Sequence, residues 1–145
     1  MEQTMKAKDI MVQPVVAVGR TTTIRDVAIQ MFLGGFSGMP VAERGGKMVG
    51  IVTEFDVIRA IRAGKAVEHT SAEDIMTEEV ISVDADADVD EVMKIMETAH
   101  VIRVPVTNKG KLVGVIARPD VLRAFIVPNF MEFSSEPGAG YVHGT

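Results

Sequence analysis

The stretch GKMVGIVTEFDVIRA at residues 46–60 returns as GKLVGVIARPDVLRA at residues 110–124, 64 positions later. Upstream, at an offset of 65, Asp9-Ile10-Met11 returns as Asp74-Ile75-Met76, and Pro40-Val41 returns as Pro105-Val106. Self-similarity over so much of a chain is the signature of an internal repeat. The sequence therefore predicts a first repeat at residues 5–64, a linker at 65–71, a second repeat at 72–127, and a partly flexible C-terminal tail at 128–145.

Both repeats carry the same order of predicted elements. A helical turn containing Asp-Ile-Met leads to a short apolar strand, expected at residues 15–18 and 80–83, where β-branched residues are frequent. A helix follows, started by Thr22 or Thr23 in the first copy and capped by Asp86 or Asp88 in the second. Its apolar positions recur at helical spacing, as Ile24, Val27, Ala28 and Met31 and then as Val89, Val92, Met93 and Met96.

A hairpin and a final helix complete each repeat. The predicted strands are 38–42 and 47–53 in the first copy and 101–107 and 111–117 in the second, joined by glycine-containing turns. The last helices are predicted at 54–63 and 118–126, the second stopped by Pro128. A unit of about 60 residues buries too little surface to be robust alone. We therefore expect an α/β (α+β) fold of two β-α-β-β-α repeats, packed as a pseudo-twofold pair with a cleft between them.

Composition narrows the classes of function. The 145 residues include 15 Lys and Arg against 20 Asp and Glu, a formal net charge of -5, which argues against a nucleic-acid partner. The chain has no cysteine, and His69, His100 and His143 are too scattered to suggest a metal site. A polar N-terminus and the lack of an apolar run of roughly 18 residues predict a cytoplasmic protein without a membrane partner.

The sequence offers no catalytic residues. Asp56 and Asp120 fall on different repeats, and no matched base, nucleophile or set of metal ligands accompanies them. The chain is therefore predicted not to be an enzyme and to need no catalytic cofactor.

The duplicated pattern resembles a known family. The Asp-Ile-Met openings, Gly38-Met39-Pro40-Val41, Arg103-Val104-Pro105-Val106 and the closing Gly50-Ile51-Val52-Thr53-Glu54-Phe55-Asp56 look like a tandem pair of cystathionine β-synthase (CBS) domains, over roughly residues 5 to 127. The resemblance implies a regulatory module, often called a Bateman module, that binds an adenosine-containing ligand between the repeats and often forms a homodimer. It also implies a regulated partner protein, which the sequence does not identify.

The first candidate site lies where the strand ending at Thr53 runs into a helix. Free N–H groups of the first helical turn attract anions, so the Thr53 hydroxyl is a candidate for a phosphate contact. The Asp56 carboxylate, one turn later, is a candidate for the two hydroxyls of a ribose. An N-terminal helix cap made by Thr53 and Asp56 accounts for the same two residues without any ligand.

The second copy departs from this pattern. It keeps the acid as Asp120, a second ribose candidate, but has Ala117 in place of the Thr hydroxyl, so we expect the capping pair to be lost. Arg118 is a candidate to supply positive charge to a phosphate instead, and Pro119 is tolerable in a first helical turn. These differences favour two sites of unequal strength.

Arg103 is the remaining phosphate candidate. Arg103 lies just before Pro105-Val106, and the resemblance implies that basic residues at this place approach the phosphates of a nucleotide. A guanidinium bonds phosphate in a bidentate manner. A surface salt bridge is the alternative for Arg103, and for His100 we favour a solvated or capping role. The weaker candidates for an apolar slot around the adenine base are Val16, Ala17, Val18, Met39, Pro40 and Ile51, together with Ile81, Val83, Val104, Pro105 and Val115.

The sequence thus predicts a sensor for an adenine nucleotide, with AMP, ADP or ATP as regulatory ligand. Two alternatives stay open. One is a sensor for S-adenosylmethionine or NAD(H), and the other is a module that dimerises or binds proteins without any ligand. In the tail, Phe130-Met131-Glu132-Phe133 is either a frayed terminus or a segment that docks across a dimer or over the cleft.

Overall fold

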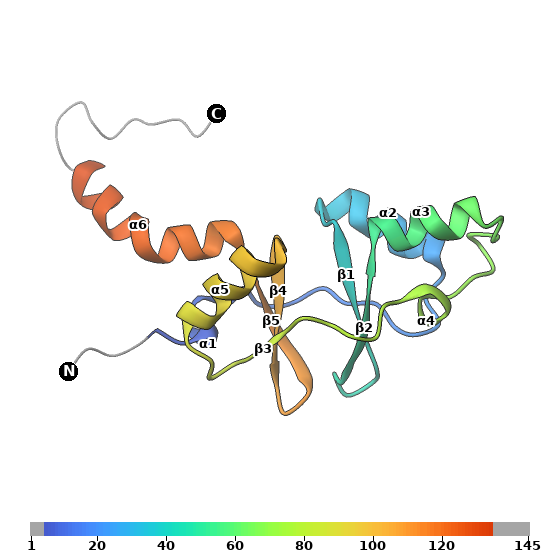
Figure 1. Cartoon of the computed structure of the whole chain (residues 1–145), viewed down its shortest axis with the longest axis horizontal. Coiled ribbons are helices and arrows are strands. Elements are labelled where there is room, and N and C mark those ends of the chain that lie inside the picture. Colours follow the sequence, from blue (N-terminus) through green and yellow to red (C-terminus); the bar gives the residue numbers. More distant parts are fainter. Residues whose placement is uncertain (1–4, 135–145) are drawn as a thin grey trace.

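The computed structural model describes residues 5–134. The first repeat contributes α2 (Ile24–Gly34), β1 (Gly38–Ala42), β2 (Met48–Thr53) and α3 (Glu54–Arg62) (Figure 1). The second contributes β3 (Val83–Asp84), α5 (Val89–Ala99), β4 (Arg103–Asn108), β5 (Lys111–Ala117) and α6 (Arg118–Ser134). Each repeat opens with a single helical turn, α1 (Ala7–Ile10) or α4 (Ala72–Ile75). The two repeats lie side by side along the longest axis, with the strands at the centre of the molecule.

The strands of the two repeats pair in the same way. β1 and β2 form an antiparallel hairpin, and so do β4 and β5. A parallel pairing is added at the same place in each repeat, between Val18 and Val41 in the first and between Val83 and Val106 in the second. The predicted hairpins and the mixed α/β fold are confirmed.

The predicted strands at 15–18 and 80–83 are wrong in length. In the first only Val18 pairs, as an isolated bridge, and in the second only Val83 pairs, continuing to Asp84. The residues just before them, 15–17 and 80–82, have no partner strand, and Val16 and Ile81 are 45% and 46% exposed. β-branched residues favour an extended backbone, but a strand also needs a neighbour to accept its hydrogen bonds.

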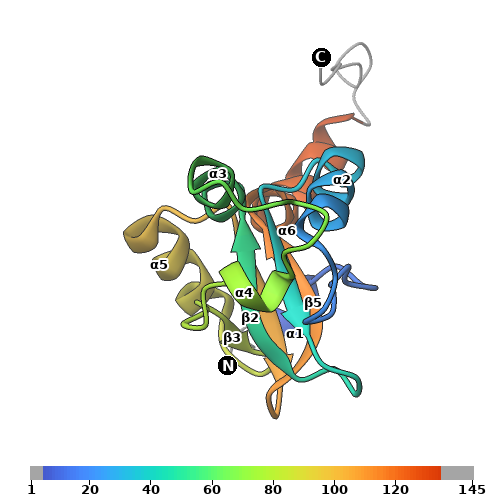
Figure 2. The same cartoon turned by 90° about the vertical axis from the view of Figure 1, so that its right-hand side faces the viewer.

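The helices begin where the sequence predicts. Thr23 caps α2, its Oγ1 accepting a hydrogen bond from the N–H of Asp26 at 3.2 Å, and Asp88 stands at the cap position of α5. The apolar stripes bury Ile24, Val27 and Met31 in the first repeat and Val89, Val92 and Met96 in the second. Figure 2 shows α2 and α3 beside each other at one end of the strands.

The last helix is longer than predicted. We expected it to stop before Pro128, but α6 continues through this residue to Ser134. A proline inside a helix removes one N–H donor and crowds the preceding turn, yet its φ is itself helical, so the helix is weakened there without having to end. Residues 135–145, which the predicted flexible tail includes, lie outside the described residues.

Each opening helical turn packs on the other repeat. Ala7 of α1 is buried in the core of the second repeat, and its N–H donates to the carbonyl of Ala87 at 2.8 Å. Ala72 of α4 is buried in the core of the first repeat, and its N–H donates to the carbonyl of Thr22 at 2.8 Å. Accordingly α1 contacts β5 and α6, and α4 contacts β2, beside which it lies in Figure 1. Each half-core is thus completed by a segment of the other repeat.

Backbone bridges also join the repeats. Val12 pairs with Val115 of β5, and at the equivalent place Thr77 pairs with Ile51 of β2. Each pair exchanges two N–H···O bonds of 2.8–3.2 Å. The two hairpins are therefore held face to face, and a cleft opens beside these bridges. Among residues 5–134, no helix has the length and apolar character needed to cross a membrane.

Candidate functional site

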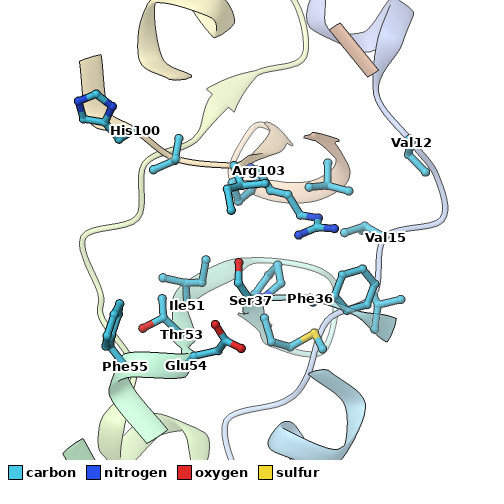
Figure 3. A pocket seen from close by; sticks show the side chains of 18 of the residues that line it. Val12, Val15, Phe36, Ser37, Ile51, Thr53, Glu54, Phe55, His100 and Arg103 are labelled. Carbon is cyan, nitrogen blue, oxygen red and sulfur yellow. The ribbon is translucent and has the colours of Figure 1, made fainter. Parts of the chain in front are cut away.

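The candidate site is a cleft of about 540 Å³ between the two repeats. This volume is within the usual range for a small-molecule site. The first repeat lines it with Val12, Pro14, Val15, Val16, Phe36, Ser37, Gly38, Met39, Pro40, Ile51, Thr53, Glu54 and Phe55. The second repeat lines it with His100, Val101, Ile102, Arg103, Pro105 and Val115. Its walls are mostly apolar, with a few polar groups that project inward (Figure 3).

Thr53 is the sequence-predicted phosphate residue that ends a strand at this cleft. Its Oγ1 already accepts a hydrogen bond from the Asp56 N–H at 3.2 Å, and the Glu54 N–H donates to the carbonyl of Ser37 at 3.1 Å. The free N–H groups that we expected at the start of α3 are therefore partly satisfied within the protein. The helix start alone does not make an anion site here.

Asp56 lies behind the wall of the cleft and not on its surface. It is 6% exposed, and its Oδ2 accepts the Thr53 N–H at 2.8 Å, completing a capping box with Thr53. Its Oδ1 accepts a hydrogen bond from Arg59 at 2.8 Å. Both carboxylate oxygens thus have partners in the structure, and the capping interpretation of Thr53 and Asp56 is confirmed.

Asp120 has the same surroundings in the second repeat. It is 8% exposed, its Oδ2 accepts the Ala117 N–H at 2.7 Å, and its Oδ1 accepts a hydrogen bond from Arg123 at 2.9 Å. The expected loss of the capping pair is wrong in part, because only the bond from the Thr hydroxyl is missing and the carboxylate keeps its own. Asp120 lines a separate hollow with Asp9 and Arg123, away from the cleft.

Arg103 and Arg118, the two basic candidates, are placed differently. Arg103 starts β4 and lines the cleft, with its guanidinium carbon 5.2 Å from the centre of the Phe36 ring. This is a cation–π contact between the two repeats. Among the side chains that the structure describes, none forms a salt bridge with Arg103, so the alternative of a surface salt bridge finds no support there. Arg118 is not among the lining residues, and its Nε donates to the carbonyl of Val101 at 3.3 Å.

His100 ends α5 in a left-handed conformation with φ 55°, at the position that Gly35 occupies after α2. His100 is thus exposed and at the cap position, which agrees with the solvated or capping role favoured for it. His100 also lines the cleft, at the upper left of Figure 3. The sequence did not predict this position.

The predicted apolar slot is divided between the cleft and the core. Val16, Met39, Pro40, Ile51, Pro105 and Val115 line the cleft. Val18, Val83 and Val104 are buried in the two cores instead, and Ala17 and Ile81 do not line the cleft. Successive side chains of an extended segment point to opposite sides of the backbone. The sequence alone does not show which side borders the cleft and which side borders the core.

Sequence reasoning missed two prominent lining residues, Phe36 and Glu54. Phe36 follows the glycine that ends α2, and an aromatic residue just after a helix cap was the one signal available for it. Glu54 directly follows Thr53, within a stretch whose other polar residues, Thr53 and Asp56, are the ones that the sequence predicts for the site. Within residues 5–134, no three His, Cys, Asp or Glu side chains are grouped so that they could hold a metal ion.

A mostly apolar cleft of this size, walled by both copies of a duplicated α/β module, has the geometry of a small-molecule site. The chain belongs to the CBS domain family. The family model for the CBS domain matches it twice, at residues 7–63 and 72–127. The predicted tandem CBS pair is confirmed.

Similar proteins fall in the same family of folds. Hypoxic response protein 1 of Mycobacterium tuberculosis is 30% identical over 81% of this chain and 82% of its own length. Its crystal structure, with two coordinated zinc ions, matches with a TM-score of 0.74 over 82% of this chain and 98% of that chain. The CBS domain pair of protein MJ0100, solved with 5′-methylthioadenosine and S-adenosyl-L-methionine, is 28% identical, with a TM-score of 0.71 over 85% of this chain and 97% of that chain.

An uncharacterized protein of Methanopyrus kandleri, MK0525, is 32% identical over 71% of this chain, which spans 54% of that protein. This chain therefore spans about half the length of that relative.

Proposed function

We propose that this CBS pair is a regulatory module that binds an adenosine-containing ligand in the cleft and acts on a partner protein in the cytoplasm without catalysing a reaction. The single observation that carries the proposal is the cleft itself, because both repeats supply its walls. The complexes of the MJ0100 CBS pair with two adenosine compounds give independent support. AMP, ADP or ATP, or one of the thioether or sulfonium derivatives of adenosine, is the regulatory ligand.

The apolar walls suit a flat base. Met39 and Pro40 lie on one side and Pro105 and Val115 on the other, so that an adenine ring inserted between them exchanges water for aliphatic contacts. The 5′ substituent then reaches the polar side chains among the lining residues, which include Thr53 and Arg103. A ribose contact by Asp56, which is 6% exposed and has its Oδ1 bound to Arg59, requires its carboxylate to become accessible from the cleft.

Ligand binding is converted into a signal through the two walls. A ligand that touches both repeats binds most tightly at one relative position of the repeats, and it shifts the population toward that position. The contact between Arg103 and Phe36 crosses the cleft at this point, so an anion that draws Arg103 away from the ring also changes a link between the repeats.

Isothermal titration calorimetry with AMP, ATP, NADH and S-adenosylmethionine tests the proposal. A Val16→Trp variant fills the cleft and is expected to abolish binding. Ile81→Trp is the matched control, because Ile81 is the equivalent residue of the second repeat, is similarly exposed and does not line the cleft. The absence of heat and of thermal stabilisation at millimolar ligand with the unaltered protein excludes the proposed function.

Exposed apolar side chains favour homodimerisation as part of this function, or as a ligand-independent alternative to it. On α2, Ile29, Phe32 and Leu33 are 38%, 80% and 84% exposed, and α6 exposes Leu122, Phe125 and Ile126. Contiguous apolar patches of this kind mark interaction surfaces. In a twofold dimer the same patch is used by both subunits, so that a surface needs to fit only itself.

A further inference from the structure

The two walls of the cleft carry opposite charges that face a common space. Glu54, the first residue of α3, projects from the first repeat, and Arg103, the first residue of β4, projects from the second (Figure 3). Within the described part of the chain, neither side chain has an oppositely charged group within 4.0 Å. Both charges are therefore available to a ligand.

The remaining charged groups nearby are already engaged or point elsewhere. Asp56 is paired with Arg59, and Arg118, which occupies the position of Glu54 in the second repeat, does not line the cleft. His100 is the one further titratable side chain among the lining residues. The fixed charges of the cleft thus consist of one carboxylate and one guanidinium, which cancel.

Arg103 is held in a manner that keeps its hydrogen-bond donors free. Its guanidinium lies over the Phe36 ring with its carbon 5.2 Å from the ring centre. A cation–π contact does not use the N–H donors of a guanidinium, and these donors fit a carboxylate in a bidentate manner. The donors of Arg103 are therefore available to an anionic group of modest size.

A triphosphate does not match this arrangement. It carries several negative charges, and one arginine is available to neutralise them while the Glu54 carboxylate repels them across a mostly apolar space. The starting turn of α3 gives little help, because the Glu54 and Asp56 N–H groups already have acceptors.

Resting on the proposed adenosine site, we propose that the cleft selects adenosine derivatives whose 5′ substituent is a zwitterionic amino acid and discriminates against nucleoside polyphosphates. The ammonium group of the ligand binds Glu54 and its carboxylate binds Arg103, so that each fixed charge gains an opposite one. Glu54 is the residue that determines this specificity, and the second repeat has Arg118 at its equivalent position.

Calorimetry with S-adenosylhomocysteine, 5′-methylthioadenosine, AMP and ATP, at one ionic strength, tests this specificity. S-adenosylhomocysteine is expected to bind at least tenfold more tightly than ATP. It is also expected to bind more tightly than 5′-methylthioadenosine, which has the same thioether but no amino acid. In Glu54→Gln the ratio of the affinity for S-adenosylhomocysteine to that for ATP is expected to fall at least fivefold. The ammonium group loses its carboxylate partner, and the phosphates of ATP are no longer repelled by that carboxylate. Glu68→Gln, an exposed change of the same charge in the linker, is expected to leave all four affinities unaltered.

The outcomes separate this inference from the proposed function. The specificity is overturned if ATP binds as tightly as S-adenosylhomocysteine, or if the ratio of their affinities is unaltered in Glu54→Gln. In either case, binding of 5′-methylthioadenosine or AMP still supports an adenosine site. Failure of all four compounds to bind overturns both. Thermal unfolding of each variant establishes that it is folded, which is expected because Glu54 is exposed and its side chain makes none of the capping bonds of α3.

Discussion

The side chain of Met76 packs directly against the backbone of Gly50. A methyl group placed on Gly50 would lie 2.6 Å from the Met76 sulfur and 3.0 Å from the carbonyl oxygen of Thr77. The same relationship joins Met11 and Gly114 in the other half of the molecule, where the distance to the sulfur is also 2.6 Å. Each Asp-Ile-Met opening thus inserts its methionine against a glycine of the opposite repeat.

Gly50→Ala is expected to destabilise the protein by about 1–3 kcal/mol, the usual cost of overpacking a core. Met76→Ala in the same chain should recover part of this loss, because a flexible side chain is removed but the Thr77 carbonyl stays close. Urea denaturation provides the measurement. Gly19→Ala is the control, since a methyl group there meets only Thr22 Oγ1, at 3.8 Å. Equal stability of Gly50→Ala and Gly19→Ala would contradict the close packing.

The two capping sites allow a reciprocal exchange. Thr53→Ala removes the Oγ1 that accepts the Asp56 N–H and is expected to cost about 1 kcal/mol, as for other N-cap hydroxyls. Ala117→Thr offers the same acceptor to the Asp120 N–H and is expected to stabilise by about 0.5–1 kcal/mol. Denaturation of both variants checks the pair. A loss of stability in Ala117→Thr would show that the second helix start has no room for the cap.

The two buried acids are expected to differ in ligand binding. Asp56→Ala and Asp120→Ala each remove a carboxylate that accepts a backbone N–H and an arginine, so both should lower stability to a similar degree. Binding of an adenosine ligand should weaken more in Asp56→Ala, because Thr53 beside it lines the cleft, whereas Asp120 borders a separate hollow. Calorimetry with AMP compares the two variants, and equal losses of affinity would refute unequal sites.

The α2 surface gives a test of the proposed homodimer with a built-in control. Leu33→Glu places a charge on the exposed apolar patch and is expected to raise the dimer dissociation constant at least tenfold. Thr98→Glu makes the same change at the equivalent position of α5, where the neighbouring Glu97 and Lys94 are charged, and should have little effect. Analytical ultracentrifugation over a range of concentrations distinguishes them. Identical dimerisation of both variants argues against α2 as the interface.

An ion pair between α1 and the second repeat predicts a small pH dependence. The hydrogen bond from Lys8, 2.9 Å from Asp86, and the charge of that lysine lower the pKa of Asp86 below its ordinary value of 3.8. The stabilisation is therefore present above pH 3.8 and is lost as the pH falls through the lowered pKa. An NMR titration of the Asp86 carboxyl should return toward 3.8 in Lys8→Met. An unchanged titration would mean that the pair is not formed in solution.

The duplication and the elements within it are determined by the sequence itself. Periodic apolar residues such as Val27 and Met31 form a buried stripe only when the chain is helical, and Thr23 supplies the hydrogen bond that starts that helix. Glycines and β-branched residues likewise mark the hairpins. These are local preferences, and the same local pattern occurs in both copies, which is why the repeat, the fold class and the family could be predicted without any coordinates.

What only the tertiary structure decided is which surfaces meet. The opening turns cross to the opposite repeat, Phe36 contacts Arg103 across the cleft, and Glu54 faces the ligand space while Arg118 at the matching position does not. The buried carboxylate of Asp56 accepts a hydrogen bond from Arg59, although a carboxylate is equally able to bind the hydroxyls of a ribose. Contacts between distant segments depend on how the shapes and charges of two whole repeats fit together, and the local preferences along the chain do not specify that fit.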